Sequence, residues 1–463
     1  MRQRAIPGWG ILLGMGLFAA PQAHGAAVDA LRAQNVVAGW LEADRTPLRT
    51  AVGQQIARVE TYNDAARAPL YHIVYLAPDG FVIVPADDQI EPIIGFAPDG
   101  EYDPSPENPL GALVENDLAD RMHRIQRSVL SASNGPATIA YSKWVQLESH
   151  TWPAARTKRG ISSVSDERVA PLLQTRWNQG TAGGNACYNY YTPPYAEGAT
   201  TNYPCGCVAT ALAQLMRFWQ HPRNGVGTTS FSITVDDVSQ SRSLRGGDGA
   251  GGAYDWSSMV TNPASSSTLA QRQAIGALCH DAGVSVNMDY ASGGSGTDTL
   301  KAKTALTSTF GYANAIKGYN SGNTIGAGLN GMVNPNLDAG CPVLFGITDG
   351  SSGHAIVCDG YGYNLSTLYH HLNLGWSGSY NAWYNLPIID TSYAFTSVYK
   401  CVYNVWTNGS GEIISGRVID EGGVPVSGAA VSASRSGGGT YTATSGVAGI
   451  YALARIPSNS TYT

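Results

Sequence analysis

The cysteine residues of this chain are confined to its middle. All seven lie between Cys187 and Cys401, and none occurs in the first 186 residues or after residue 401. Any chemistry that depends on a thiol must therefore reside in the central part of the chain. A length of 463 residues agrees with about three domains of ordinary size, and the flanking stretches differ from the central one in composition.

The first 26 residues have the pattern of a secretory signal peptide. Arg2 and Arg4 precede an apolar run over residues 11–20, and small residues follow around Ala26. A run of about 10 residues is too short to span a bilayer, which takes about 20. We expect a chain that is exported, to the outside of the cell or to a periplasm, without a membrane span.

Residues 27–147 are predicted to form an α+β domain. β-prone runs at 71–76 and 81–84 are separated by Pro78-Asp79-Gly80, which indicates a hairpin. Apolar residues then recur at helical spacing from Leu113 to Val129. Residues 148–168 carry Arg156, Lys158 and Arg159 among several Ser and Thr residues, which predicts an exposed, protease-sensitive linker.

The central domain is predicted over residues 169–405. Its first clear helical pattern is Cys207–Trp219, and β-prone runs at 342–347 and 354–358 are separated by a turn-like stretch. Alternating strands with Gly-rich turns then predict a small β-sandwich over residues 411–463. The sequence stops within a strand-like run, so we expect that this last domain is truncated.

Cys207 is the strongest candidate for a reactive residue. It follows Gly206 and opens a helix with apolar residues at helical spacing. Free N–H groups and the partial positive charge at a helix start favour a thiolate. A buried structural cysteine or half of a disulfide is the alternative, and the neighbouring Cys205 has the same claim until a base is identified.

His354 is the candidate base for that nucleophile. It lies 147 residues after Cys207 (354 − 207), a spacing typical of papain-type peptidases. Asn373 is a candidate for orienting the imidazole. Gln179, 28 residues before Cys207 (207 − 179), is a candidate oxyanion donor. Each residue also has a purely structural alternative. His354 could be a core histidine, Asn373 a turn residue and Gln179 a polar loop residue.

Several other classes of site are disfavoured. Cys205-Gly206-Cys207 lacks the spacing and the second ligand pair of a zinc site. The sequence has no Gly-x-Ser-x-Gly elbow, His-Glu-x-x-His helix or phosphate-binding loop. Charged residues make up only 13% and the net charge is −6, which disfavours nucleic-acid binding. We expect neither a metal nor a cofactor.

At this point the motifs resemble the streptopain family of secreted bacterial cysteine peptidases. The matching segments occur in family order between Trp177 and Trp376: 177–180, 206–216 with 221–222, 254–256, 283–290 and 353–355. The resemblance implies an α+β, papain-like peptidase domain. It makes Cys207 the nucleophile and His354 the base, with Gln179 at the oxyanion hole.

The resemblance also assigns parts of the substrate cleft and of the precursor. The loop 291–296, with Ser292 and Ser295, is similar to the family's substrate-cleft loop, and Trp376 is assigned to substrate binding. Leu374 replaces the family's tryptophan beside Asn373, so shielding of the His–Asn contact falls to Trp376. Residues 27–147 resemble the family's inhibitory pro-domain, which linker cleavage would release. Residues 411–463 resemble a carboxypeptidase-regulatory-like module.

The expected function is that of a secreted cysteine endopeptidase made as an inactive zymogen, acting on proteins or peptides as a monomer through a Cys–His thiolate–imidazolium pair and a thioester. Two alternatives remain at this stage: an inactive adhesin or binding protein with a peptidase fold, and an acyltransferase that uses the same pair. With Cys207 reserved for catalysis, six cysteines allow up to three disulfides.

Overall fold

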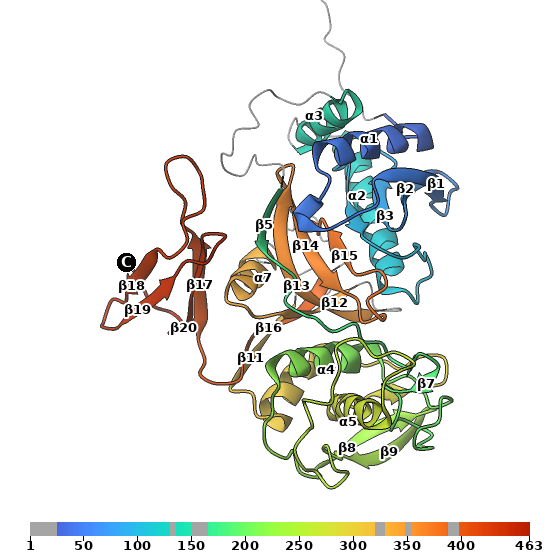
Figure 1. Ribbon diagram of the computed structural model, residues 1–463, viewed down its shortest axis with the longest axis vertical. Helices are drawn as coiled ribbons and strands as arrows, with labels where there is room; N and C mark the ends of the chain where they lie inside the picture. The colour runs from blue at the N-terminus through green and yellow to red at the C-terminus, as the bar shows by residue number, and fades with distance from the viewer. Residues whose placement is uncertain (1–25, 130–135, 151–164, 320–328, 348–352, 388–397) are drawn as a thin grey trace, which may run out of the picture.

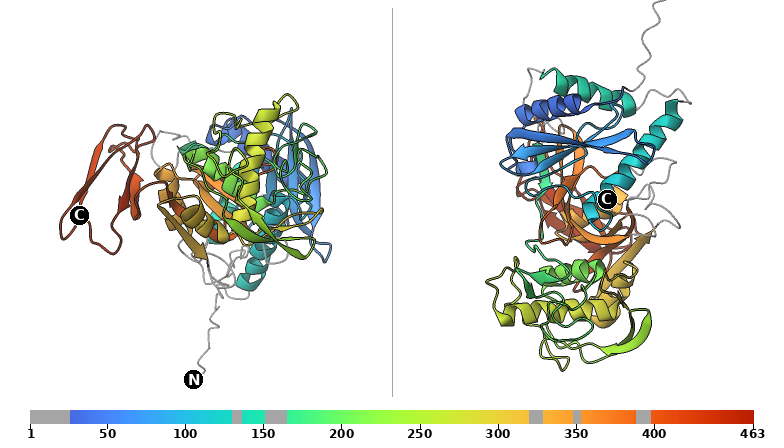
Figure 2. Two further views of the ribbon diagram at one scale, coloured as in Figure 1. Left: turned by 90° about the horizontal axis from the view of Figure 1, so that it is seen from below. Right: turned by 90° about the vertical axis from the view of Figure 1, so that its right-hand side faces the viewer.

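The computed structural model describes residues 26–129, 136–150, 165–319, 329–347, 353–387 and 398–463. The expected signal peptide, most of the expected linker and the turn expected after residue 347 lie outside these residues. In the described part, three bodies are stacked along the long axis: the amino-terminal domain, a large sheet, and a lobe containing α4 and α5 (Figure 1). A fourth, small module lies to one side (Figure 2). The α+β fold predicted from the sequence is confirmed.

The amino-terminal domain packs helices on a strongly twisted antiparallel sheet. The predicted hairpin is β2 and β3, which pair from Tyr71↔Pro85 to Tyr75↔Phe81, and the predicted amphipathic helix is α2. Asp29 caps α1 by accepting a hydrogen bond from the backbone N–H of Arg32 at 2.8 Å. The elements are α1 (Ala30–Ala43), a 3₁₀ turn η1 (Pro47–Arg49), β1 (Gln55–Asn63), β2 (Pro69–Ala77), β3 (Phe81–Pro85), β4 (Gly95–Ala97), α2 (Pro109–Val129) and α3 (Pro136–Glu148).

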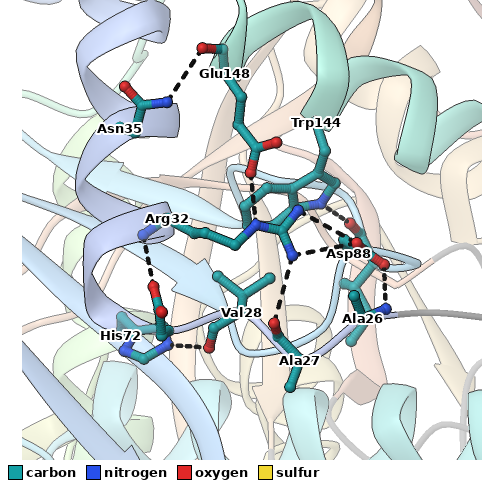
Figure 3. A network of polar contacts seen from close by, with 11 residues as sticks. Ala26, Ala27, Val28, Arg32, Asn35, His72, Asp88, Trp144 and Glu148 are labelled. Atoms are coloured by element: carbon teal, nitrogen blue, oxygen red, sulfur yellow. Dashed lines mark hydrogen bonds and ion pairs between the residues drawn. The ribbon is translucent and has the colours of Figure 1, made fainter.

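Arg32 links α1 to the end of α3 (Figure 3). Its guanidinium lies 2.8 Å from Glu148, the last residue of α3, and 3.3 Å from the buried carboxylate of Asp88. Asn35 adds a hydrogen bond to the carbonyl of Glu148 at 3.1 Å. The end of α3, from which the chain runs toward the next domain, is therefore held in place.

The central domain consists of a lobe around α4 and α5 and a lobe built on the sheet. Its α4 has the bounds predicted from the sequence, and α5 begins with a capping box in which Thr268 and Gln271 exchange hydrogen bonds. The elements of the first lobe are β6 (Thr181–Ala182), β7 (Asn185–Ala186), α4 (Cys207–Trp219), β8 (Ser230–Val235), β9 (Val238–Ser243), α5 (Leu269–Ser285), β10 (Asp289–Tyr290), α6 (Lys301–Thr304) and a π turn η3 (Ala305–Thr309).

The second lobe contributes most of an 11-stranded sheet that runs through both domains. The order is β1-β2-β3-β4-β15-β14-β13-β12-β16-β11, with β5 also paired to β13. The predicted strands at 342–347 and 354–358 are β12 and the start of β13, and they pair antiparallel. The elements are β5 (Ser165–Val169), β11 (Asn314–Tyr319), α7 (Leu329–Asp338), β12 (Val343–Ile347), β13 (His354–Asn364), β14 (Thr367–Asn373), β15 (Ala382–Tyr384) and β16 (Val398–Trp406).

The two domains meet where β4 pairs with β15. Phe96 lies opposite Trp383 and Gly95 opposite Tyr384, so the amino-terminal domain continues the sheet of the central domain. One hydrophobic cluster contains Leu113 and Leu118 of α2 together with Ile356 and Tyr384 of the central sheet. The amino-terminal domain is thus packed into the core of its neighbour, not merely tethered to it.

The sheet of the central domain begins earlier in the chain than predicted. The linker is expected to extend to residue 168, but Ser165–Val169 form β5, which pairs antiparallel with β13. Asp166 is buried there by contacts from other parts of the chain, which a polar sequence read by itself does not reveal. Residues 151–164 of the expected linker lie outside the described residues.

The carboxy-terminal module has four strands and a small core of its own. β17 pairs with β20 and β18 with β19, and the core is formed by Ala433, Leu453 and Ile456 with partly buried neighbours. The two small sheets correspond to the predicted β-sandwich pattern. The strands are β17 (Glu412–Arg417), β18 (Ala430–Ser434), β19 (Thr440–Thr444) and β20 (Ile450–Ile456).

All seven cysteines are buried free thiols, so the structure does not contain the expected disulfides. Cys358 and Cys401 cannot pair with each other, because they lie on β13 and β16, the two strands that flank β12. Strands separated by a third strand are about 9–10 Å apart, beyond the reach of a disulfide, whose Cα atoms lie within about 7 Å.

Within the described part of the chain, no helix combines the length and the apolar character needed to cross a bilayer.

Candidate active site

Cys207 is the first residue of α4, and the residue before it must be glycine. Gly206 has φ +92°, and a Cβ there would lie 2.8 Å from the sulfur of Met288 and 2.8 Å from the carbonyl oxygen of Ser295. A glycine fits because it has no Cβ and tolerates positive φ. The loop that contains Ser295 can therefore pack directly against the start of α4, beside Cys207.

The Cys207 sulfur lies between the start of α4 and the start of β13. Burial raises the pKa of its thiol, while the backbone N–H groups of Ala355 and Val208, which point at the sulfur, act in the opposite direction. Val208 belongs to the helix N-terminus and Ala355 directly follows His354. The side chain retains 9% exposure. The structure thus brings the predicted nucleophile next to the strand that carries the predicted base.

His354 is occupied by a contact from the amino-terminal domain. Its Nε2 lies 2.9 Å from the carbonyl oxygen of Pro106, and because a carbonyl only accepts, this nitrogen carries the proton. Burial lowers the pKa of His354, opposed by the Pro106 carbonyl and by the charge of Glu107. A raised thiol pKa and a lowered imidazole pKa favour the neutral pair. The charged pair predicted from the sequence is therefore not the favoured form while Pro106 is in place.

Sequence reasoning missed the segment that contains Pro106. It precedes Asn108, whose side chain accepts a hydrogen bond from the N–H of Leu110 at 2.9 Å in the first turn of α2. The Asn108-Pro109 pair is a recognisable helix start. Nothing in the sequence indicates that the residues before this helix reach His354, because the contact joins residues 248 positions apart.

Gln179 is placed close to the nucleophile through its backbone. The N–H of Cys205 donates to the carbonyl of Gln179 at 2.8 Å, which fixes the 177–180 segment beside the start of α4. Trp376 belongs to the turn on the other side of this segment, where the N–H of Ser377 donates to the carbonyl of Trp177 at 2.9 Å. The predicted oxyanion residue and the predicted substrate-binding tryptophan are therefore brought together.

Asn373 is buried in a network that does not include His354. Its Oδ1 accepts hydrogen bonds from Gln214 Nε2 at 3.1 Å and from the N–H of Gly375 at 3.2 Å, and its Nδ2 donates to the carbonyl of Thr175 at 2.8 Å. The Thr175 hydroxyl in turn donates to Gln214 at 2.7 Å. An orienting role for Asn373 toward His354 stays a prediction. Gln214 was missed, although a glutamine between Ala213 and Leu215 on an apolar helix could have indicated it.

The two predicted cleft serines differ in their surroundings. Ser292 is exposed on the loop after β10, whereas Ser295 is buried, and its hydroxyl has no hydrogen-bond partner among the residues that the structure describes. The Ser295 backbone is the part that contacts Gly206. Ser295 is therefore near the nucleophile, and its hydroxyl is free to bind another group.

Cys205, the rival for the role of nucleophile, and two further histidines have structural contacts of their own. The Cys205 sulfur is buried and lies 3.3 Å from the hydroxyl of Thr210. His280 and His371 each contact a buried aspartate, Asp281 at 2.8 Å and Asp359 at 2.6 Å. Among the described residues, no three His, Cys, Asp or Glu side chains are grouped so that they could hold a metal ion.

These contacts define what the arrangement can do chemically. A thiol at a helix start has two N–H groups directed at its sulfur, the strand that begins with His354 lies beside it, and an amide-bearing loop is fixed next to the helix start. Such a constellation suits nucleophilic attack on a carbonyl. A carbonyl from another domain keeps the imidazole engaged.

Comparison with known families agrees with this geometry. Residues 177–384 match the Peptidase C10 family, and residues 25–116 match the Spi protease inhibitor family. The central domain therefore matches the peptidase C10 family, and we call it the C10 domain. The matched region contains every predicted site residue, and the inhibitor-like region ends at residue 116 within α2, just after the segment that contacts His354.

Individual relatives share both regions. The chain is 27% identical over 390 residues to the thiol protease/hemagglutinin PrtT of Porphyromonas gingivalis, covering 82% of this chain and 41% of PrtT. It therefore spans less than half the length of that relative. It is 22% identical over 357 residues to streptopain of Streptococcus pyogenes serotype M1, covering 74% of this chain and 80% of streptopain.

The fold has a solved counterpart. A mutant fragment of Prevotella intermedia prointerpain A superimposes with a TM-score of 0.55 at 23% identity, covering 75% of this chain and 98% of the fragment. At this identity the likeness concerns the fold. It extends over a precursor form, in agreement with an amino-terminal domain that is packed onto the C10 domain.

Proposed function

We propose that this protein is a cysteine endopeptidase made as an inactive precursor, exported by means of residues 1–26, and acting on protein or peptide substrates. The observation that carries the proposal is the position of Cys207. Its sulfur lies at the start of α4 and accepts from the N–H of Ala355, the residue after His354. The nucleophile and the base thus come from adjoining elements of one C10 domain.

In the proposed reaction, His354 takes the proton of the Cys207 thiol once the Pro106 carbonyl has left. The thiolate attacks the peptide carbonyl carbon, and Gln179 with the backbone N–H groups at the start of α4 stabilises the oxyanion. His354 then gives its proton to the leaving amine. It next activates a water molecule, which hydrolyses the thioester and regenerates the thiol.

We further propose that the amino-terminal domain is the inhibitor of this activity. The Pro106 carbonyl binds the proton on His354 Nε2, and burial beneath this segment favours the neutral imidazole. This burial works against the Cys207–His354 ion pair while the segment is in place, although the carbonyl itself favours a protonated imidazole. Cleavage between Glu148 and Ser165 would remove the covalent link that keeps this contact in place.

The test of catalysis compares three purified proteins in a casein cleavage assay with a reducing agent. Cys207→Ala is expected to abolish cleavage, and Cys205→Ser, with an equally buried thiol two residues away, is expected to retain it. Persistence of cleavage in Cys207→Ala would overturn the assignment. Product mass spectrometry tests the reaction type, because products with an added amine in place of water would indicate acyl transfer.

The test of maturation incubates the wild-type precursor beside Cys207→Ala. Conversion of the wild type alone would establish self-processing, whereas equal conversion of both would indicate an outside protease. A mechanism-based epoxide inhibitor should label Cys207 only after the amino-terminal domain has been removed. Equal labelling of the intact precursor would contradict inhibition through His354.

A further inference from the structure

The carboxy-terminal module is joined to the C10 domain by a buried ion pair with two hydrogen bonds. Both terminal nitrogens of Arg417, in β17, contact the carboxylate of Asp166, in β5, at 2.6 and 2.7 Å. The two side chains are only 14% and 8% exposed. A bidentate arginine–carboxylate pair fixes orientation as well as distance.

A second carboxylate of the C10 domain, that of Asp338, also binds the module. The hydroxyl of Ser415, also in β17, donates to Asp338 at the end of α7 at 2.6 Å. The other oxygen of Asp338 accepts from Tyr361 of β13 at 2.8 Å. Burial raises the pKa of Asp338, opposed by these hydrogen bonds. The module therefore binds at a defined face made by β5, β13 and α7, visible beside β17 in Figure 1.

Besides its strand pairing, β5 is held by contacts with the amino-terminal domain that would leave with that domain: the N–H of Leu48 donates to the hydroxyl of Ser165 at 2.6 Å, and Arg49 lies 3.5 Å from Glu167. In the described structure β5 pairs with one strand, β13, from Tyr361↔Val169 to Asn364↔Ser165. β5 pairs with the part of β13 that follows Cys358, the last residue of β13 that pairs with β12. Cleavage of the chain before Ser165 would make β5 the amino-terminal strand of the processed enzyme, and end strands fray unless they are tied down.

The module is anchored independently of its own core. Ala433, Leu453 and Ile456 form a separate cluster, so its position on the C10 domain depends on polar contacts. The connection after β16 adds to them, since Asn404 Nδ2 donates to Glu412 at 3.1 Å. Arg417 is also fixed within the module, where its Nε donates to the carbonyl of Ala448 at 2.9 Å.

We propose that the carboxy-terminal module is a brace for strand β5, binding Asp166 through Arg417 and staying attached to the C10 domain after the amino-terminal domain has gone. Part of this inference, the role of the brace after cleavage, rests on the proposed processing. The interaction surface itself, Asp166 and Asp338 on the C10 side with Arg417 and Ser415 on the module side, is present in the uncut chain.

Hydrogen exchange of the full-length Cys207→Ala chain tests the brace without any peptidase activity. Arg417→Ala is expected to speed exchange of the β5 amides, residues 165–169, by about tenfold or more. Arg417→Lys should have an intermediate effect because an ammonium cannot form the fork. Arg455→Ala removes the same charge from an arginine that lies over Trp406 of β16. It weakens the attachment of the module without touching Asp166, so its effect on β5 should be smaller than that of Arg417→Ala.

Asp166→Asn provides the second arm, since it weakens the same pair from the C10 side and leaves the module sequence intact. It also weakens the ion pair of Asp166 with Arg168 at 3.0 Å, which Arg417→Ala leaves in place. It should speed β5 exchange to a similar extent, and combining it with Arg417→Ala should add little. Unchanged β5 exchange in both single variants would overturn the brace. So would equal acceleration in β5 and throughout β12 and β13, which would indicate general destabilisation.

The consequence for processing has a separate readout. In active protein, Arg417→Ala should produce amino termini trimmed beyond Val169, detected by intact mass, where wild type retains Ser165. If Cys207 proves not to be catalytic, the intact-mass measurement no longer reports on self-processing. The hydrogen-exchange result for β5 still tests the brace. If the enzyme is active and Arg417→Ala does not change exchange in β5, the brace proposal is refuted while the proposed peptidase activity stands.

Discussion

The domains at the two ends of this chain bind the C10 domain in opposite ways. The amino-terminal domain continues the central sheet through β4 and β15 and shares hydrophobic clusters with it. The carboxy-terminal module keeps a core of its own and uses an ion pair and hydrogen bonds. The domain proposed to be discarded is thus the more deeply integrated. Depth of packing does not indicate which part of a precursor is permanent.

The largest difference is expected at acid pH, where the stability of the C10 domain should fall for a reason that does not apply to the carboxy-terminal module. His370 in β14 is buried, and burial lowers its pKa to about 3. The unfolded chain takes up this proton near pH 6.5, so stability falls as the pH drops from about 6.5 to 3, by about 5 kcal/mol in all. His370→Gln should flatten the dependence of Tm on pH over this window.

The module provides the internal control for this prediction. Residues 411–463 contain no histidine, so the exchange protection of β17 and β20 should be the same function of pH in wild type and His370→Gln. A Tm that depends on pH equally in the two proteins would show that His370 does not remain neutral in the folded state.

The boundary between the amino-terminal and C10 domains should behave as a protein core. Asp117 of α2 is fully buried, pairs with Arg121 at 2.9 Å and accepts a hydrogen bond from Tyr384 of β15 at 2.8 Å. Asp117→Ala leaves the Arg121 charge without its partner, which typically costs about 3–5 kcal/mol. Thermal unfolding of the Cys207→Ala precursor measures the loss.

Glu115→Ala is the matched control, because Glu115 lies on the same helix and is exposed. It should leave the Tm within about 1 °C, since substitutions at such surface positions change stability by less than about 0.5 kcal/mol. If Asp117→Ala behaves like Glu115→Ala, the two domains are joined more loosely than their continuous sheet indicates.

A smaller effect is expected where a single neutral hydrogen bond crosses the same boundary. The indole N–H of Trp383 donates to the hydroxyl of Thr50 at 2.7 Å. Thr50→Val keeps the shape of the side chain and leaves the indole unpaired, a cost of about 1–3 kcal/mol. The effect should be seen in the uncut precursor and vanish once the amino-terminal domain has been removed. Equal stability of the Thr50→Val and wild-type precursors would contradict it.

The smallest effect is expected at the tip of the carboxy-terminal module. Val447 is 91% exposed, so Val447→Ser should change stability by less than about 0.5 kcal/mol. Urea unfolding, compared with wild type, measures it. A larger loss would mean that this tip is buried against another molecule or segment, and that the module binds through more than the face containing Arg417.

The sequence predicted what depends on local pattern. The bounds of α4, the β2–β3 hairpin and the β12–β13 pair follow from periodicity and turn residues, and the positions of Cys207 and His354 follow from a helix start and a familiar spacing. It did not predict Pro106 at His354, Gln214 at Asn373 or Arg417 at Asp166. Each of these contacts joins residues more than 150 positions apart, and single polar residues carry no periodic pattern.

The continuous sheet changes what cutting the linker accomplishes. Cleavage breaks a covalent bond, but the β4–β15 pairing and the shared clusters remain. The severed domain then becomes an ordinary ligand, bound according to its dissociation constant and its concentration. Enzyme activity after processing should therefore rise on dilution and fall again when the protein is concentrated. The onset of activity would be governed by how far the protein spreads after export, not only by when it is cut.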